Sequence, residues 1–385
     1  MKVLYIHHVS VIGGSSRSLY ELISNLPKTV QPTVMCPIGE FNDFLQDKNI
    51  PTINVRGVPQ FDNTRIGFYR RLRWLILLRE LFYLPFFIQA IYKCKEESFD
   101  IVHINEITQL FSIVFAKKIA KKVIVHTRSV QRVSNSWRNK IIRKILLCNA
   151  DLVVAIDETV RSSLPDDVPV EVVHNGITLD NVIPHKKSEK FTVGIVSNFQ
   201  RYKGILEFID AANICINEYN LDINFVVYGA SYSKNQKSIK ERVLQMLGFR
   251  ENLEEIIKTK LEQYHLESKL KLKGYVGNHN EIYNYIDILV FPSHLNAVGR
   301  PVFEAGFYGI PSIVAIKDPI KDTFVDGVTG LAMEEKNSQD FAQKIKYLYE
   351  NPDKVEKMGE NAAKSAYQNF DSQKNSIKIF EIYKR

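Results

Sequence analysis

A loop that runs into a helix start is the clearest candidate for chemistry in this chain. Residues 286–291 (IDILVF) have the composition of a buried strand, and residues 292–300 form a loop. Pro301 suits the first position of a helix, where its missing N–H has no partner to lose, and residues 309–311 (Gly-Ile-Pro) end that helix. The unpaired backbone N–H groups that follow Gly299, with the positive end of the helix dipole behind them, favour a bound phosphate.

Glu304 lies one turn inside this expected helix. Its carboxylate oxygens are strong acceptors for the hydroxyl groups of a ligand whose phosphate occupies the helix start. A ligand with a phosphate and neighbouring hydroxyl groups of this kind would be a sugar nucleotide. The plainer alternative is an ordinary strand–loop–helix unit with an incidental glutamate.

The segment resembles the signature of the retaining glycosyltransferases of family 4, which have the two-domain GT-B fold. That signature is usually Glu, then Gly-Phe-Gly, then a second Glu followed by Ala and a helix that ends Gly-x-Pro. Here residues 296–299 read Asn-Ala-Val-Gly and residues 304–305 read Glu-Ala. The first acidic residue is therefore replaced by Asn296, while the second half of the pattern is kept.

The resemblance implies a role for each of these residues. Val298, Gly299 and Arg300 would hold the diphosphate of a nucleotide-sugar donor. Asn296 would face the sugar, and Glu304 would bind the ribose hydroxyls. Enzymes of this kind lack an obvious protein nucleophile, so no general base is assigned.

A second loop carries cations suited to the same diphosphate. Residues 194–204 (GIVSNFQRYKG) read as a strand, a loop and a helix start at Lys203. The family pattern here is Gly-Arg-Leu followed by Lys-Gly, whose two cations neutralise the departing diphosphate. Asn198 stands in place of that arginine, and Arg201 is placed to supply the missing charge. The alternative is that Lys203 is a solvated lysine at a helix start.

A glycine pair in the first half fits the same ligand. Gly13 and Gly14 follow a strand at residues 3–7 and precede a helix that Ser15 or Ser16 could cap. The pair resembles the family's glycine loop, which lies under the donor diphosphate, although a plain tight turn explains it equally well. No Gly-x-Gly-x-x-Gly occurs, so nothing here indicates a nicotinamide or flavin.

His126 ends an apolar strand and is expected at the carboxyl edge of a parallel sheet. In similar enzymes this histidine contacts the transferred sugar, so we group it with Lys203 and Glu304 as catalytic residues. His103 holds the equivalent place on the preceding strand, where a structural histidine is the favoured interpretation. The structural alternative stays open for His126 as well.

Residues 275–277 (Tyr-Val-Gly) resemble the family loop whose backbone, at Val276, grips the nucleotide base. Backbone contacts do not reveal which base is bound. The sequence contains no Asp-x-Asp and no histidine–carboxylate cluster with metal-ligand spacing. We therefore expect no metal and no cofactor beyond the nucleotide-diphosphate sugar as co-substrate.

Short apolar stretches alternate with longer amphipathic ones, which is typical of parallel sheets covered by helices. For 385 residues this predicts an α/β protein with two domains. The resemblance implies that it has the GT-B fold, with two Rossmann-like domains whose parallel sheets face a central cleft. We expect domains at 1–180 and 190–370, and a helix at 371–385 that crosses back to the first domain. Strands are expected near 3–7, 33–36, 52–55, 100–104, 122–126, 151–155, 170–173, 191–196, 223–228, 270–273, 286–291, 312–315 and 329–332.

Basic residues gather in the first half. Residues 117–144 contain 10 Lys or Arg and no acidic residue, and residues 65–95 contain 7 with one Glu. The second stretch is also apolar, which suits an amphipathic helix, bent at Pro85, on an anionic membrane surface. A core helix with a solvated basic face is the equal alternative, and no nucleic-acid motif accompanies the charge. The residues expected at the membrane are Arg65, Arg70, Arg71, Arg73, Arg79, Trp74, Phe82, Phe86 and Phe87.

The chain is expected to work in the cytoplasm, either free or attached peripherally at the inner face of the membrane. Its first residues show no signal-peptide pattern, and no apolar run approaches the roughly 20 residues needed to cross a bilayer. Its cysteines show no paired spacing.

These features together predict a retaining glycosyltransferase. It would move a sugar from a nucleotide-sugar donor to a hydroxyl of a glycan or lipid-linked saccharide in cell-surface polysaccharide synthesis. Two alternatives stay open. One is a non-catalytic scaffold or regulatory subunit, which the paired change to Asn198 and Asn296 favours. The other is a sugar-nucleotide epimerase, which can share this fold.

Overall fold

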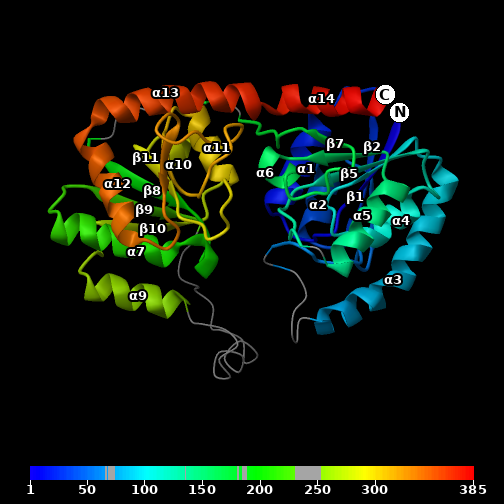
Figure 1. Cartoon of the computed structure of the whole chain (residues 1–385), viewed down its shortest axis with the longest axis horizontal. Helices are drawn as coiled ribbons and strands as arrows, with labels where there is room; N and C mark the ends of the chain where they lie inside the picture. Colours follow the sequence, from blue (N-terminus) through cyan, green and yellow to red (C-terminus); the bar gives the residue numbers. More distant parts are fainter. Residues whose placement is uncertain (66, 68–73, 135, 180–181, 184–188, 230–252) are drawn as a thin grey trace. The chain divides into compact units, whose positions relative to one another are not determined.

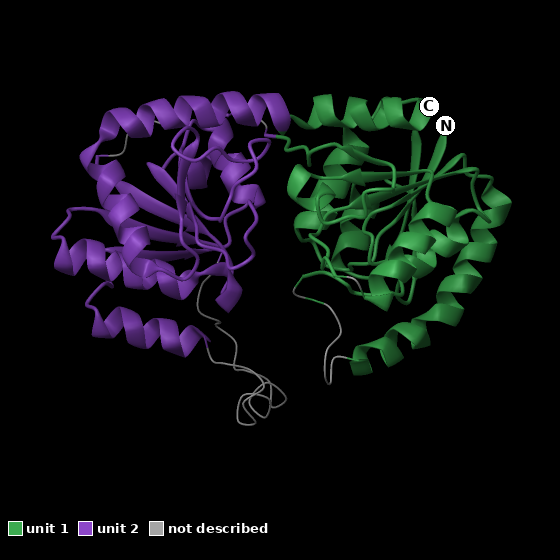
Figure 2. Ribbon diagram, viewed as in Figure 1, with its two compact units in different colours: residues 1–178, 370–385 green, residues 179–369 purple. Residues whose placement is uncertain are grey.

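The computed structural model describes residues 1–65, 67, 74–134, 136–179, 182–183, 189–229 and 253–385. The chain forms two compact units, residues 1–178 with 370–385 and residues 179–369 (Figure 2). The last segment of the chain thus belongs to the first unit, which we call unit 1. Each unit contains one parallel sheet with helices, so the expected α/β fold is confirmed.

Unit 1 contains a seven-stranded sheet in the order β3-β2-β1-β4-β5-β6-β7, and all neighbouring strands are parallel. Its strands are β1 (Lys2–Ile6), β2 (Gln31–Pro37), β3 (Thr52–Val55), β4 (Ile101–Ile104), β5 (Lys122–Thr127), β6 (Leu152–Ala155) and β7 (Val170–Val172). Its helices are α1 (Gly14–Ser24), α2 (Glu40–Asp47), α3 (Leu75–Cys94), the 3-10 turn η2 (Lys95–Glu97), α4 (Leu110–Ala116), α5 (Trp137–Asn149), α6 (Glu158–Arg161) and α14 (Ser372–Lys384) (Figure 1).

Alternation along the strands divides these helices between the two faces of the sheet. Leu4 and Ile6 of β1 pack in one cluster with Phe87 of α3 and with residues of α4 and α5. Val3 and Tyr5 pack on the opposite face, in a cluster with residues of α1, α2 and α14. The C-terminal helix therefore covers the same face as the helix that follows the glycine pair.

Unit 2, residues 179–369, contains a six-stranded sheet in the order β10-β9-β8-β11-β12-β13, again with parallel neighbours. Its strands are β8 (Thr192–Val196), β9 (Asn224–Tyr228), β10 (Leu270–Gly274), β11 (Ile288–Phe291), β12 (Ser312–Ala315) and β13 (Gly330–Met333). Its helices are η3 (Arg201–Lys203), α7 (Ile205–Asn213), the π-helical turn η4 (Ile214–Glu218), α9 (Leu253–Gln263), α10 (Asn280–Tyr283), α11 (Arg300–Phe307), α12 (Ser338–Glu350) and α13 (Pro352–Asn369).

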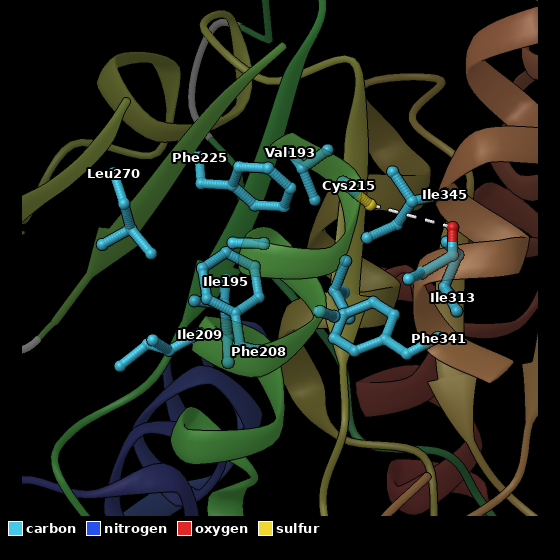
Figure 3. Packing of buried hydrophobic residues seen from close by; sticks show 14 of the residues in the cluster. Val193, Ile195, Phe208, Ile209, Cys215, Phe225, Leu270, Ile313, Phe341 and Ile345 are labelled. Carbon is cyan, nitrogen blue, oxygen red and sulfur yellow. Dashed lines mark hydrogen bonds between the residues drawn. The ribbon is translucent and has the colours of Figure 1, made fainter. Parts of the chain in front are cut away.

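The core of unit 2 lies between its strands and the helices α7 and α12. Cys215 of η4 is fully buried there, and its Sγ lies 3.8 Å from the carbonyl oxygen of Ala342. Figure 3 shows how the strand residues Val193, Ile195, Phe225, Leu270 and Ile313 gather around Phe208, Ile209, Phe341 and Ile345. All thirteen expected strands are present, with ends that differ by at most two residues.

The strand order of each sheet determines where a ligand site can form. In unit 1 the order reverses between β1 and β4, and in unit 2 between β8 and β11. Loops that leave two such neighbouring strands diverge to opposite faces and open a crevice at the carboxyl edge. The glycine pair follows β1, and the two anion-binding loops expected in the second half follow β8 and β11.

Helix α3 differs in two ways from the sequence-based expectation. Among the described residues, the segment Leu75–Glu97 is long and apolar enough to cross a bilayer, although no run of that length was expected. Only 17% of its most apolar window is buried. The prediction that Phe87 lies at the membrane is wrong, because its side chain is fully buried in the core of unit 1. Arg70, Arg71 and Arg73 lie outside the described residues.

Candidate active site

The anion-binding loop expected after β11 leads into α11, an eight-residue helix whose N-cap is Gly299. No side chain caps this helix start, and Pro301 occupies its first turn. A Cβ on Gly299 would overlap the ring of Phe291, so glycine is needed for the loop to pack on the end of β11. The backbone N–H groups of the first turn are therefore not covered by a capping side chain.

Glu304 is buried one turn into α11 and holds a cluster of three side chains. Its Oε2 accepts a hydrogen bond from the Tyr283 hydroxyl at 2.7 Å, and its Oε1 accepts one from Arg300 Nε at 2.6 Å. His279 Nε2 lies 3.4 Å from the same Oε1. Burial alone would raise the pKa of Glu304, but the His279 hydrogen bond and the Arg300 charge outweigh it and set the pKa at about 2.

This cluster qualifies the role expected for Arg300. Its guanidinium is directed back along α11 to Glu304, as an i,i+4 ion pair. Sequence analysis did not single out His279 and Tyr283. They are four residues apart, with His279 as the N-cap of α10 and Tyr283 as its last residue, and their nearly parallel rings are 6.3 Å apart between centroids. That helical spacing was a signal available in the sequence, although it does not name Glu304 as the partner.

Asn296 stands where the family has its first acidic residue. Its backbone is in the left-handed region, with φ at 47°. Asparagine tolerates this conformation better than most residues do. The side-chain Oδ1 accepts a hydrogen bond from the backbone N–H of Lys317, just beyond β12, at 2.6 Å. The residue thus ties the loop after β11 to the loop after β12.

The loop after β8 is joined to the loop after β11. Gly204 has φ at 77°, and a Cβ there would overlap the carbonyl oxygen of Pro292. The backbone N–H of His294 donates to the carbonyl oxygen of Tyr202 at 2.8 Å. The packing and the hydrogen bond both hold η3, which contains Lys203, against the segment that leads to α11.

Lys203 is half-buried beside aromatic rings. Its Nζ lies 5.3 Å from the ring centroid of Tyr202 and 5.9 Å from that of Phe291. Loss of solvent around the ammonium lowers the pKa of Lys203 below its ordinary value of 10.5. Since Gly299 packs on the same Phe291 ring, the lysine and the start of α11 share a neighbour.

Three other predicted donor-binding residues of unit 2 lie outside its strands and α-helices. Asn198 and Arg201 are exposed between β8 and α7, and the Asn198 carbonyl oxygen accepts from the Ser197 hydroxyl at 2.8 Å. Val276 is half-buried after β10. It lines a cavity of about 490 Å³ together with Tyr228 and Lys273.

In unit 1, Gly13 is the N-cap of α1, and the expected cap by Ser15 or Ser16 is wrong. The Ser16 hydroxyl instead donates to the carbonyl oxygen of Val11 at 2.9 Å and lies 3.1 Å from His7 Nε2. A Cβ at Gly13 or Gly14 would meet no described atom within 4 Å. Packing within the described chain therefore does not explain why these two residues are glycines.

His126 is buried at the end of β5. Its Nδ1 lies 3.2 Å from Nε2 of His103 on β4, so the two strand-end histidines contact each other. Its Nε2 is also buried and has no hydrogen-bond partner among the described residues. Burial, together with the positive charge of Arg128, lowers the pKa of His126 well below 6.5 and keeps the ring neutral.

Arg128 connects His126 to the glycine loop through residues that sequence analysis did not assign to the site. Its Nε donates to Asn105 Oδ1 at 2.8 Å, and its Nη1 donates to Asn175 Oδ1. The Asn105 amide lies 2.9 Å from His7 Nδ1, and His7 in turn contacts Ser16. Burial lowers the pKa of Arg128 to about 10, so it stays a cation at neutral pH.

Glu106 follows Asn105 and is also buried near Arg128. Burial raises the pKa of its carboxyl to about 7, partly offset by the backbone N–H of Ile107. Their positions in the sequence could have identified these residues as site candidates. His7, Asn105, Glu106 and Arg128 all follow strands β1, β4 or β5 at the carboxyl edge of the sheet.

Comparison with known proteins identifies the family of this chain. The family model described as "Glycosyl transferases group 1" matches residues 178–365, and that described as "Glycosyltransferase Family 4" matches residues 12–181. The capsular polysaccharide biosynthesis glycosyltransferase CapM of Staphylococcus aureus is 27% identical over 60% of this chain and 61% of its own length. The uncharacterized glycosyltransferase MJ1069 of Methanocaldococcus jannaschii is 22% identical over 72% of each chain.

Solved structures show the same architecture. HepE of Anabaena, solved in complex with UDP, superposes with a TM-score of 0.77 at 18% identity over 99% of both chains. At 18% sequence identity, this similarity establishes the fold alone. The two family models together extend from residue 12 to residue 365, and the chain belongs to the family 4 type of glycosyltransferases with the GT-B fold.

Proposed function

We propose that this transferase moves a sugar, with retention at the anomeric carbon, from a nucleotide-diphosphate sugar to a hydroxyl of a saccharide or lipid-linked acceptor. The observation that carries the proposal is the junction of two loops at the β8–β11 switch point. There a backbone hydrogen bond joins the loop that contains the half-buried Lys203 to the loop that leads into α11. Helix α11 has an uncapped start and carries the buried Glu304 carboxylate. An anion site beside a carboxylate is what a nucleotide sugar requires.

The proposed donor contacts follow from this geometry. The diphosphate lies at the N–H groups following Val298 and Gly299, with Lys203 supplying positive charge. The ribose hydroxyls bind Glu304, whose two oxygens offer about four acceptor sites. Tyr283, Arg300 and His279 occupy three of them, which leaves acceptor capacity for a ribose hydroxyl.

The remaining predicted residues complete the donor site. Asn296 faces the sugar, Arg201 and Asn198 border the diphosphate, and the Val276 backbone contacts the base. The glycine pair, with open space above the start of α1, lets the chain approach the donor closely. Arg300 acts by holding the Glu304 carboxylate and presents its own backbone N–H to the diphosphate.

The proposed reaction needs no protein nucleophile and no metal. The bond between the anomeric carbon and the diphosphate oxygen breaks, and the acceptor oxygen bonds to the same face of that carbon. The leaving diphosphate oxygen takes the acceptor proton. The protein contributes by stabilising the charge that develops on the diphosphate and by holding the sugar beside His126.

The names of related proteins support the proposed donor and acceptor classes. HepE was also solved with UDP-glucose, and CapM acts in capsular polysaccharide biosynthesis. A poly(glycerol-phosphate) alpha-glucosyltransferase of Bacillus subtilis matches 49% of this chain and 25% of its own length. We therefore propose a uridine diphosphate sugar as donor, a cell-surface polysaccharide precursor as acceptor, and the cytoplasm as the place of action.

A thermal-shift screen with UDP-, GDP- and ADP-sugars tests this proposal. The matching donor at about 100 times its dissociation constant is expected to add about 2.7 kcal/mol of stability. The matching nucleoside monophosphate, which lacks the diphosphate, is the control and should stabilise the protein much less. A protein that no sugar nucleotide stabilises would be a scaffold, and turnover of the sugar nucleotide to its epimer without acceptor would indicate an epimerase.

We also propose that unit 1 docks on an anionic membrane through α3. The outward side of this helix carries large apolar side chains, with Leu78 64% exposed and Phe82 60% exposed. Glu80, on the buried side of the helix, attaches it to unit 1. Its carboxylate accepts a hydrogen bond from the Gln60 backbone N–H at 3.1 Å and forms an ion pair with Arg79 at 2.5 Å. These contacts of Glu80 set the orientation of α3, so that the side with Leu78 and Phe82 faces solvent.

Cations surround this apolar side. Arg138 lies over the ring of Trp74 at 4.6 Å, and Arg56 lies over the ring of Phe86 at 4.1 Å. Each basic residue near an anionic lipid surface contributes about 1 kcal/mol of attraction, which salt screens. Apolar insertion combined with this attraction suits an enzyme whose acceptor is linked to lipid.

Co-sedimentation with vesicles tests the membrane proposal. The protein is expected to bind vesicles that contain phosphatidylglycerol, more strongly at low salt than at high salt, and to ignore neutral vesicles. Replacing Leu78 and Phe82 by Ser should weaken this binding about a hundredfold, because about 3 kcal/mol of apolar burial is lost. Ile377→Ser, at an exposed apolar site on α14, is the control. Unchanged binding of the Leu78/Phe82 variant would disprove the docking surface.

A further inference from the structure

A hollow in unit 1 lies apart from the residues assigned so far. Two adjoining cavities, of about 370 Å³ and about 460 Å³, share the lining residues Gln131, Val133, Ser162 and Ser163, so they form one continuous hollow. Its walls come from the loops that follow β3 and β5, the start of α5 and the turn that follows α6. Because loops that follow parallel strands gather at the carboxyl edge, the hollow belongs to the same edge of the sheet as His126.

Hydrogen bonds between distant segments build the walls of this hollow. The backbone N–H of Arg132 donates to the Asn63 carbonyl oxygen at 3.0 Å, which joins the loop after β5 to the loop after β3. The Asn63 side-chain amide donates to Asn139 Oδ1 on α5 at 2.9 Å. The backbone N–H of Gln131 donates to the Ser163 hydroxyl oxygen at 3.0 Å. These bonds join four segments, so the shape of the hollow is set by the fold.

Two buried amide side chains supply oxygen atoms to the walls. The NH₂ group of Gln131 donates to the carbonyl oxygen and the hydroxyl oxygen of Ser129, at 3.0 and 3.2 Å. That of Asn63 donates to Asn139, so each amide keeps its oxygen as an acceptor. Neither Gln131 Oε1 nor Asn63 Oδ1 accepts a hydrogen bond from a residue that the structure describes. Buried amide groups are nearly always hydrogen-bonded, so these two oxygens suit the hydroxyl groups of a ligand.

Positive charge prevails around the hollow. Its described lining contains four Lys or Arg and one acidic residue, Asp166. Arg143 is neutralised by Asp167, because its Nε donates to Asp167 Oδ1 at 2.9 Å and its Nη2 pairs with Oδ2. Lys140 and Arg65 form no ion pair with another described residue. Two cations without a counter-charge favour an anionic ligand.

Apolar side chains and an exposed indole complete the surroundings. Val133, Ile142 and Leu164 line the hollow, and Trp137, which is 56% exposed, lies one turn before Lys140 on α5. The C–H faces of a sugar ring pack on such apolar groups, while its hydroxyls require acceptors such as the amide oxygens. Cations, acceptors and apolar walls together match an anionic saccharide, and the volume is that of a ligand site.

We propose that the hollow binds an anionic saccharide, and that it is a subsite for the part of the acceptor that carries a phosphate or a carboxylate group. The acid group lies against Lys140, with Arg65 adding positive charge, and the sugar hydroxyls donate to Gln131 Oε1 and Asn63 Oδ1. That the saccharide belongs to the acceptor rests on the proposed function. Its binding rests on the hollow alone, so the two can be tested separately.

Titration of the full-length ¹⁵N-labelled protein, followed by NMR with UDP present to fill the donor site, tests the ligand class. The probes are glucose 6-phosphate, glucuronate, glucose and inorganic phosphate. At least one of the two acidic sugars is expected to bind about tenfold more tightly than glucose or inorganic phosphate, the size of one charge-assisted hydrogen bond. The tighter acidic sugar identifies the acid group. Equally tight binding of glucose would remove the role of the anion, and equally tight binding of inorganic phosphate would remove that of the sugar; either result would overturn the proposal.

Two charge reversals on α5 locate the site. Lys140→Glu is expected to weaken binding of the tighter acidic sugar about tenfold or more, because it places a like charge beside the acid group. Lys144→Glu makes the same change one turn along, at an exposed lysine outside the described lining, and should leave the affinity unchanged. Ser162→Phe fills the hollow and should abolish binding of the same sugar. Equal losses in Lys140→Glu and Lys144→Glu would show unspecific attraction to a basic helix and overturn the site.

The proposed donor and this subsite fail in different ways. If an acidic sugar binds in a manner that depends on Lys140 while no sugar nucleotide binds, the proposed donor is wrong and the saccharide site stands. If UDP-glucose binds and neither acidic sugar binds at millimolar concentration, the donor stands and the inference about the hollow is overturned.

Discussion

Replacing Lys203 with alanine is expected to lower turnover about a hundredfold, the size found when one preorganised electrostatic contact is removed from an active site. The lysine is half-buried against Phe291, next to the loop that leads to α11. Charges in such partly desolvated places are screened less than charges in water. The loss should appear in kcat, because the diphosphate gains charge as it leaves.

Two further variants make the test specific. Lys203→Arg keeps the cation and should retain much of the activity. Lys258→Ala removes an exposed lysine of α9 that pairs with Glu262, and it should have no effect. Arg201→Ala should cost less than Lys203→Ala but remain measurable. Turnover of Lys203→Ala at the level of the unmodified enzyme would refute the role of Lys203.

Glu304→Gln is expected to abolish detectable binding of the donor nucleotide in calorimetry. Glutamine keeps the size of the side chain but places an NH₂ donor against partners that are themselves donors, Tyr283 and Arg300. It also leaves the partly buried Arg300 charge without its carboxylate, which costs several kcal/mol at buried sites. The melting temperature should fall, while circular dichroism should show the same secondary structure.

Tyr283→Phe is the matched control for Glu304. It removes one hydrogen bond from the same carboxylate and keeps the charge, so donor affinity should fall by only a few-fold. Donor binding by Glu304→Gln with unmodified affinity would show that the carboxylate is structural and that ribose is held elsewhere.

The pH dependence of Glu304 has a definite sign. Its pKa is about 2 in the folded protein, below the ordinary 4.5, because His279 and Arg300 outweigh the effect of burial. A carboxyl with a depressed pKa stabilises the fold fully above pH 4.5 and loses that contribution as the pH falls towards 2. Titration of Glu304 therefore contributes no change in donor binding between pH 5 and 8.

The sequence by itself determined the architecture and the loops that follow β8 and β11. Apolar stretches of strand length, spaced by amphipathic ones, predicted all thirteen strands, because burial on both faces of a parallel sheet requires such runs. Gly299, Pro301 and Glu304 are near neighbours in the chain, so the rules for helix termini place them on one helix without further information. Lys203 was predicted from the resemblance of residues 194–204 to the family pattern.

Only the tertiary structure decided which side chains meet. Tyr383 and His103 are separated by 280 positions, and no local rule connects a tyrosine of the last helix with a strand-end histidine. The partners of Glu304, the tie between Asn296 and Lys317, and the burial of Phe87 in place of exposure also depend on packing between distant elements. Periodicity shows which face of an element is apolar, but the neighbour on that face is set by strand order and helix packing, which bring together segments far apart in the chain.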